Sequence, residues 1–130
     1  MESRNYTVVD VSGNPAYFDK DIDFIVTSAT SGLTKTFEVK WDSCINRTGN
    51  LYLELTNINS KQWSGQGWWE HCQADYLVYG DACTQTFYII PLLELREKVK
   101  MLPTRSARCG YDSTGLLVSL KDIADITQIL

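Results

Sequence analysis

Apolar and polar positions alternate through the first half of the chain, a pattern typical of β-strands. Residues 6–11 are rich in β-branched side chains and stop at a Ser-Gly-Asn-Pro turn cluster, which predicts a strand. Residues 22–27 and 34–41 are joined by a segment containing Ser and Gly, which suits a hairpin. A further strand is predicted over 51–55, after an Arg-Thr-Gly-Asn turn. We therefore expect 22–27, 34–41 and 51–55 to form three adjacent antiparallel strands.

The second half of the chain mixes helix and strand patterns. Pro91 suits the first position of a helix, and an apolar stripe that includes Leu95 and Val99 continues it until Pro103. The isoleucines of 121–130 recur at helical spacing and predict a last helix. The remaining expected elements are an irregular loop over 60–69, a helical turn over 70–74, and strands over 76–79, 86–90 and 116–120.

This order of elements predicts an α/β (α+β) domain, with a mixed β-sheet flanked by helices that begin near Pro91 and Lys121. A chain of 130 residues with 44% apolar side chains is long enough for one domain with a substantial core. No internal repeat or linker divides it. Residues 1–130 are therefore expected to form a single domain.

Two features indicate a soluble protein without a membrane partner. The longest apolar runs, such as 87–93, are far too short to span a bilayer. The first residues lack the basic and apolar regions of a signal peptide, so we expect a cytoplasmic location. The four cysteines are spread singly, without a Cys-x-x-Cys pair, which favours buried free thiols over a zinc site.

The net charge of −4 argues against a protein that coats nucleic acid through a strong positive field. The distribution of charge changes this picture. Residues 96–108 contain five of the twelve basic residues and one acid, Glu97. This segment is interpreted as a phosphate-contacting patch, with a solvated helix end and loop as the equally weighted alternative.

The strand over 34–41 carries the candidate chemistry. Alternation places Glu38 and Lys40 on one face and Phe37, Val39 and Trp41 on the other, and we expect Lys40 to face solvent. In the preceding strand the apolar positions take the core side, which leaves two aspartates, Asp21 and Asp23, on the opposite face. If the two strands pair as a hairpin, an aspartate and Glu38 converge close to Lys40.

Phosphodiester hydrolysis needs such a group, because a hard cation such as Mg²⁺ prefers oxygen ligands and is held by one or two carboxylates with several waters. The carbonyl of Val39 would be a further oxygen ligand. A nearby ammonium orients the attacking water or stabilises negative charge in the transition state. The alternative is an amphipathic strand with cross-strand ion pairs, since an acid-x-Lys tripeptide occurs about once by chance in a chain of this length.

Several segments in order along the chain resemble small nucleases of the PD-(D/E)xK (restriction-endonuclease-like) superfamily, of the type found in phages and bacteria. The resemblance covers about half of the chain. Its segments are Asp-Ile-Asp-Phe-Ile-Val at 21–26, Thr-Phe-Glu-Val-Lys-Trp-Asp at 36–42, Thr-Gly-Asn-Leu-Tyr-Leu-Glu at 48–54, Gly-Trp at 67–68 and Ala-Asp-Tyr-Leu-Val-Tyr at 74–79.

The resemblance implies a restriction-endonuclease-like core and a metal-dependent endonuclease that hydrolyses DNA in a bacterial cell or phage-infected host. It assigns catalysis to Asp23, Glu38 and Lys40, with Mg²⁺ or Mn²⁺ held by Asp23, Glu38 and the Val39 carbonyl. Asp23 is preferred to Asp21 because it stands where an Ile-Asp pair enters the apolar run. Glu54 follows the resemblance as an additional ligand or, equally, as a surface carboxylate.

Other interpretations stay open beside this one. The chain could be a catalytically inactive nuclease-fold module that binds nucleic acid or a protein partner, or an enzyme for a smaller phosphate ester. A homodimer with its contact at the apolar residues 126–130 is an alternative to a monomer. Trp63, Trp68 and Trp69 are candidates for base stacking, with core packing as the commoner role. His71 is a candidate proton carrier or a structural residue.

Overall fold

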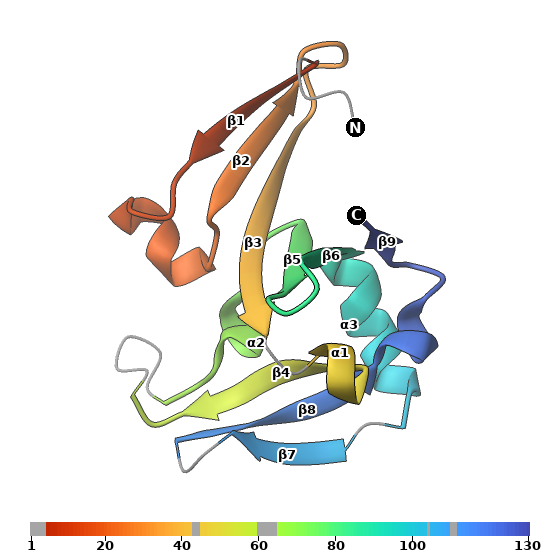
Figure 1. Cartoon of the computed structure of the whole chain (residues 1–130). Helices are drawn as coiled ribbons and strands as arrows, with labels where there is room; N and C mark the ends of the chain where they lie inside the picture. The colour runs from red at the N-terminus through yellow and green to blue at the C-terminus, as the bar shows by residue number, and fades with distance from the viewer. Residues whose placement is uncertain (1–4, 43–44, 60–64, 104, 110–111) are drawn as a thin grey trace.

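The computed structural model describes residues 5–42, 45–59, 65–103, 105–109 and 112–130 (Figure 1). Trp63 and Cys44 lie outside these ranges. The elements, in chain order, are β1 (Tyr6–Asp10), the 3-10 helix η2 (Pro15–Lys20), β2 (Phe24–Ser28), β3 (Thr34–Asp42), α1 (Ile45–Thr48), β4 (Asn50–Asn57), α2 (Trp68–His71), β5 (Tyr76–Asp81), β6 (Thr86–Pro91), α3 (Leu92–Met101), β7 (Arg105–Cys109), β8 (Ser113–Ser119), the 3-10 helix η4 (Leu120–Ile123) and β9 (Gln128–Ile129).

The strands of the described ranges form two sheets. The larger has six strands in the order β1-β2-β3-β5-β6-β9, and the smaller has three in the order β4-β8-β7. Every neighbouring pair is antiparallel except β3 and β5, which are parallel, so the larger sheet is mixed. The predicted α/β class with a mixed sheet is confirmed, although helices are few.

The expected hairpin is present, but its third strand is not where it was predicted. Phe24 of β2 pairs with Phe37 of β3 in an antiparallel register. The strand after it, β4, leaves this sheet and pairs with β8, and the free side of β3 is taken by β5. Leu51 and Leu53 of β4 are completely buried in this arrangement. Pairing with β8 therefore places the apolar face of β4 in the core, where it is removed from water.

The C-terminal helix predicted over 121–130 is wrong. Helical turns end after η4, and β9 pairs with β6 through Ile129 and Gln128. Ile123 is fully buried but Ile129 is 63% exposed, so the isoleucine spacing does not mark one buried helical face. The helix predicted from Pro91 is confirmed as α3. The strand β7 was not anticipated, because the segment that contains it was interpreted only as a basic patch or as a solvated helix end and loop.

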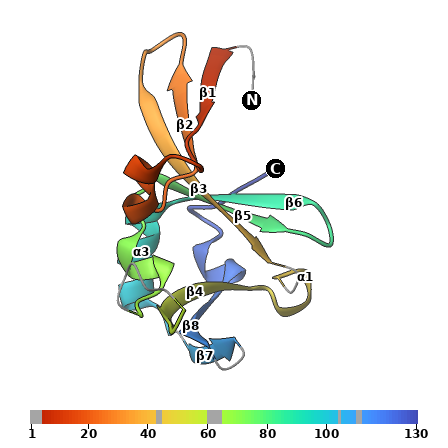
Figure 2. The same ribbon diagram turned by 90° about the vertical axis from the view of Figure 1, so that its left-hand side faces the viewer.

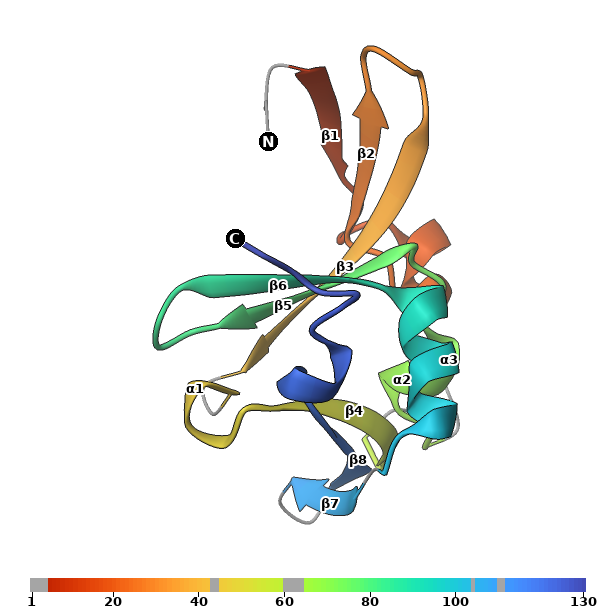
Figure 3. The ribbon, with the colours of Figure 1, turned by 90° about the vertical axis from the view of Figure 1, so that its right-hand side faces the viewer.

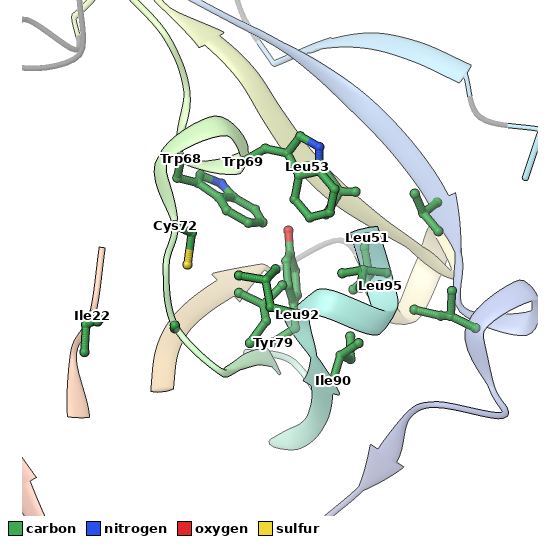
Figure 4. Close-up of a cluster of buried hydrophobic side chains, with 14 of the residues drawn as sticks. Ile22, Leu51, Leu53, Trp68, Trp69, Cys72, Tyr79, Ile90, Leu92 and Leu95 are labelled. Carbon is green, nitrogen blue, oxygen red and sulfur yellow. The ribbon is translucent and has the colours of Figure 1, made fainter. Parts of the chain in front are cut away.

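The core lies between the two sheets, with α3 along one side (Figures 1, 2 and 3). Leu77 and Ile90 from the larger sheet, Leu51 and Leu53 from the smaller and Leu95 from α3 are all completely buried. Figure 4 shows Leu51, Leu53, Ile90 and Leu95 converging with Trp68, Trp69 and Tyr79. Each large aliphatic side chain buried in this way stabilises the fold by about 1.5–3 kcal/mol.

None of the helices in the described ranges is long and apolar enough to cross a membrane.

The structure describes the side chains of two cysteines, Cys72 and Cys83. Cys72 is buried, as expected, whereas Cys83 is exposed, because it lies in the turn between β5 and β6 and not in the core.

Gly115 of β8 tests the packing of the smaller sheet. A methyl group there would lie 2.6 Å from the carbonyl oxygen of Leu53 and 2.7 Å from the ring of Tyr52, whereas one at Gly13 would meet no atom within 4 Å. Gly115→Ala should therefore lower the free energy of unfolding by about 1–3 kcal/mol through overpacking. Gly13→Ala is the control, with a change within about 0.5 kcal/mol. Urea unfolding measures both, and equal effects would contradict the packing described here.

Candidate functional site

The charged face of β3 points into the molecule. Glu38 is paired across the sheet with Leu77, and Leu77 with Ile90, so the three side chains share one face. Leu77 and Ile90 are fully buried, and Glu38 is 4% exposed, whereas Trp41 on the other face is 60% exposed. The prediction that Glu38 and Lys40 share a face is confirmed, but the expectation that Lys40 faces solvent is wrong. Period-two alternation defines which residues share a face, and the covering layer decides which face is inside.

Three charged side chains converge on this inner face. Lys40 Nζ lies 2.9 Å from Glu38 Oε1 and 3.3 Å from Asp21 Oδ2. The ladder of β2 with β3 ends at the Phe24–Phe37 pair, and Asp21 reaches Lys40 from the segment before β2. The expected convergence of an aspartate, Glu38 and Lys40 is therefore present, and the aspartate in contact with the ammonium is Asp21. Alternation placed Asp21 and Asp23 on the same face, so the sequence pattern did not distinguish which of them meets Lys40.

The backbone at Asp21 holds its carboxylate in place. Asp21 has a φ of 55°, in the left-handed region that few residues other than glycine adopt. Its carbonyl accepts a hydrogen bond from the thiol of Cys72 at 3.5 Å, and the carbonyl of Lys20 accepts one from the backbone N–H of Gln73 at 2.8 Å. Strained backbone held by surrounding contacts is concentrated at functional sites.

Asp23 occupies a different place from Asp21. Its backbone N–H donates to the carbonyl of Phe37 at 2.9 Å, and its Oδ2 accepts a hydrogen bond from the backbone N–H of Val39 at 3.0 Å. This carboxylate lies beside β3 at the point where β2 has not yet begun. The N–H and carbonyl of one strand residue face the same edge, so the Val39 carbonyl is directed toward the Asp23 side of β3.

Buried aromatic and sulfur groups wall the site. Lys40 Nζ lies 5.0 Å from the centre of the Trp68 ring, a cation–π contact. Burial raises the pKa of the Cys72 thiol to about 12, so the thiol stays neutral beside the charged cluster. Trp68 and Trp69 are each only 7% exposed, so the interpretation that they stack on bases is wrong and the alternative of core packing holds.

Burial and neighbouring charges shift the pKa values of Glu38 and Lys40. Loss of solvent raises the pKa of Glu38 to about 9; Lys40 opposes this shift, and Asp21 and Asp23 reinforce it. Burial acts to lower the pKa of Lys40, but the negative charges of Asp21 and Glu38 outweigh it and raise this pKa above its ordinary value. Lys40 therefore stays protonated at neutral pH and can donate hydrogen bonds.

The oxygen atoms of the cluster suit a hard divalent cation. Glu38 Oε2 is buried without a hydrogen bond in the described part of the chain, whereas the buried Asp21 Oδ2 lies 3.3 Å from the ammonium of Lys40. Mg²⁺ needs only one or two carboxylates, with waters completing its shell. Across the described ranges no three His, Cys, Asp or Glu side chains are grouped to hold a metal by themselves. A cation here would keep several waters and use the backbone oxygen of Val39.

The other two polar candidates, Glu54 and His71, form hydrogen bonds with residues outside the Lys40 cluster. Glu54 Oε2 accepts hydrogen bonds from Ser113 at 3.0 Å and Asn57 at 3.3 Å on the smaller sheet. His71 Nε2 is 2.6 Å from the side-chain oxygen of Gln66. These contacts fix Glu54 in a polar network of the β4–β8 pair.

The basic segment 96–108 is divided between α3 and β7. The guanidinium of Arg96 donates to a backbone carbonyl at 2.9 Å and lies 4.6 Å from the centre of the Trp69 ring, which makes it structural. Lys98 and Lys100 form ion pairs with acidic neighbours. The two arginines of β7 line a separate cleft.

No protein-family model, curated protein or solved structure matches this chain.

The raised pKa of Glu38 predicts how stability depends on pH. Between the unfolded pKa near 4.5 and the folded pKa near 9, the folded protein keeps a proton that the unfolded chain releases, so rising pH favours unfolding. In the presence of a chelator, the free energy of unfolding should fall from pH 5.5 to pH 9. Glu38→Gln, which resembles the protonated acid, should show a flatter profile. A wild-type profile that rises relative to the variant over this window would contradict the assignment.

Proposed function

We propose that the protein is a metal-dependent endonuclease that hydrolyses DNA phosphodiester bonds and has a restriction-endonuclease-like core. The observation that carries the proposal is the contact of Lys40 Nζ with both Glu38 and Asp21, on the covered face of β3. Burying an ion pair is costly and stabilises a fold weakly, so such a cluster in a small core favours a role in chemistry.

The sheet topology supports the same proposal. An antiparallel hairpin, β2 and β3, is followed by a parallel neighbour, β5, and the end of β3 runs beyond β2. The candidate site lies at this end of β3, beyond its pairing with β2. The resemblance of segments 21–26 and 36–42 to the PD-(D/E)xK superfamily falls on these strands.

We assign the roles of the residues from their contacts. Asp23 and Glu38, with the carbonyl of Val39, would hold Mg²⁺ or Mn²⁺. The bound cation would polarise the phosphoryl oxygen and acidify a water. Lys40 remains protonated and donates hydrogen bonds to the attacking water or to the phosphoryl oxygen on which negative charge develops. Asp21 positions the ammonium of Lys40. Trp68 and Cys72 exclude bulk water and so strengthen these electrostatic contacts.

Lys40→Met is the direct test of catalysis. It keeps an unbranched side chain and removes the ammonium that contacts Trp68, Glu38 and Asp21. Cleavage of supercoiled, linear, branched and single-stranded DNA with Mg²⁺ or Mn²⁺ should fall by about 100-fold or more. Lys35→Met is the matched control, since Lys35 is exposed on the same strand, and it should cut at the wild-type rate. Undiminished cleavage by folded Lys40→Met protein would refute the proposal, and wild-type protein that binds DNA without cutting it would favour an inactive module.

Metal titration distinguishes the proposed roles of Asp21 and Asp23. Asp23→Asn should raise the Mn²⁺ concentration needed for half-maximal cleavage by about tenfold or more, because a cation ligand is lost. Asp21→Asn should lower the rate at saturating Mn²⁺ with little change in that concentration, because it loosens Lys40. The reverse pattern would place the cation on Asp21.

A further inference from the structure

Trp41 is an exposed aromatic side chain held in one orientation. It follows Lys40 on β3, lies on the outer face of the larger sheet and is 60% exposed. A methyl group built on Gly80 would lie 2.8 Å from the Trp41 ring, so the indole packs directly over the glycine backbone. The ring of Phe87 meets it edge-on, with centroids 5.3 Å apart and planes at 70°. The indole is therefore positioned by its neighbours while much of its surface stays in water.

A cleft of about 510 Å³ begins at this tryptophan. It is lined by Trp41 and Asp42 of β3, by Tyr52 of β4, and by Arg105 and Arg108 of β7. Its volume is within the range of sites that hold small organic molecules. Arg105 is exposed and forms no ion pair in the described part of the chain, so its guanidinium is available to an anion.

The cleft adjoins the candidate active site. Tyr79 lines the cleft and is paired with Lys40 across the β3–β5 ladder. Its hydroxyl donates to the carbonyl of Tyr52 at 3.1 Å, which links the larger sheet to the smaller. The cleft therefore begins at the residue that follows Lys40 on β3.

We propose that this cleft binds one unpaired nucleotide of the substrate, with its base stacked on Trp41 and its phosphate on Arg105. The choice of nucleic acid as the ligand rests on the proposed function. Bases inside a duplex are stacked on both sides and offer no free face to an indole, whereas a single-stranded segment does. The inference therefore gives the substrate class as DNA with a single-stranded, flapped or branched segment beside the cleaved bond.

The polarity of the cleft agrees with one phosphate and one base. Arginine presents planar donors that match a phosphate. Asp42 follows Trp41 on β3 and also lines the cleft, and its negative charge disfavours a second phosphate next to Trp41. The base is thus directed to the aromatic side and the backbone to β7.

Binding is measured by fluorescence anisotropy with labelled oligothymidine and with a duplex of equal length, in a chelator so that no cleavage occurs. Wild-type protein should prefer the single strand. Trp41→Ala should weaken single-strand binding by about 5- to 150-fold, which is the range for loss of one base–aromatic stack, and leave duplex binding unchanged. Trp41→Phe should retain most of the affinity, and Arg105→Ala should weaken binding and reduce its dependence on salt. Leu93→Ala and Lys121→Ala, at exposed positions outside the cleft, are the controls.

Thermal unfolding of each variant establishes that it is folded. Equal single-strand affinity of folded Trp41→Ala and wild-type protein would overturn the inference, as would equal loss of single-strand and duplex binding. The two proposals fail separately. Single-strand binding that depends on Trp41, in a protein that cuts no DNA, would refute the nuclease and keep the cleft. Cleavage that depends on Lys40, but with no effect of Trp41→Ala on binding or cutting, would refute the cleft alone.

Discussion

The constraint on which the structure depends is a group of opposite charges enclosed between two β-sheets. Lys40 is held by Glu38 and Asp21, and Glu38 lies in line with fully buried leucine and isoleucine side chains. Removing charges from water costs several kcal/mol for each ion unless partners compensate it. The ammonium, both carboxylates and the ring of Trp68 must therefore come together in one arrangement. This requirement ties the hairpin, α2 and the start of β5 to one another.

The division into two sheets makes that enclosure possible. Had β4 paired beside β3, the charged face would have lain on one open sheet. Instead β4 pairs with β8 and forms the opposing layer, while β5 takes the place beside β3. β2 begins only at Phe24, so the end of β3 runs beyond it, and the carboxylate of Asp23 accepts a hydrogen bond from the N–H of Val39 there. The side chain of Lys40 is 24% exposed, so the covered site is not fully closed.

Covering the charged face leaves the apolar face of the same strand outside. Trp41 is therefore exposed because Lys40 is enclosed, and both belong to one stretch of β3. This relation connects the two proposals: the covered face of β3 would perform hydrolysis, and the cleft at the end of the same strand, which Trp41 lines, would hold the neighbouring nucleotide. Tyr79, which pairs with Lys40 and lines the cleft, lies between them.

The sequence by itself determined the local features: the β2–β3 hairpin, the strands at β5 and β6, the helix after Pro91, and the shared face of Glu38 and Lys40. These depend on turn residues and short-range periodicity, which act within a few residues. Tertiary structure decided the rest. Which face of β3 is inside, which strand lies beside it and whether Asp21 or Asp23 meets Lys40 depend on contacts between distant segments. The isoleucines after Lys121 followed helical spacing, yet pairing with β6 placed Ile129 in a strand, because partners far along the chain outweigh weak local preference.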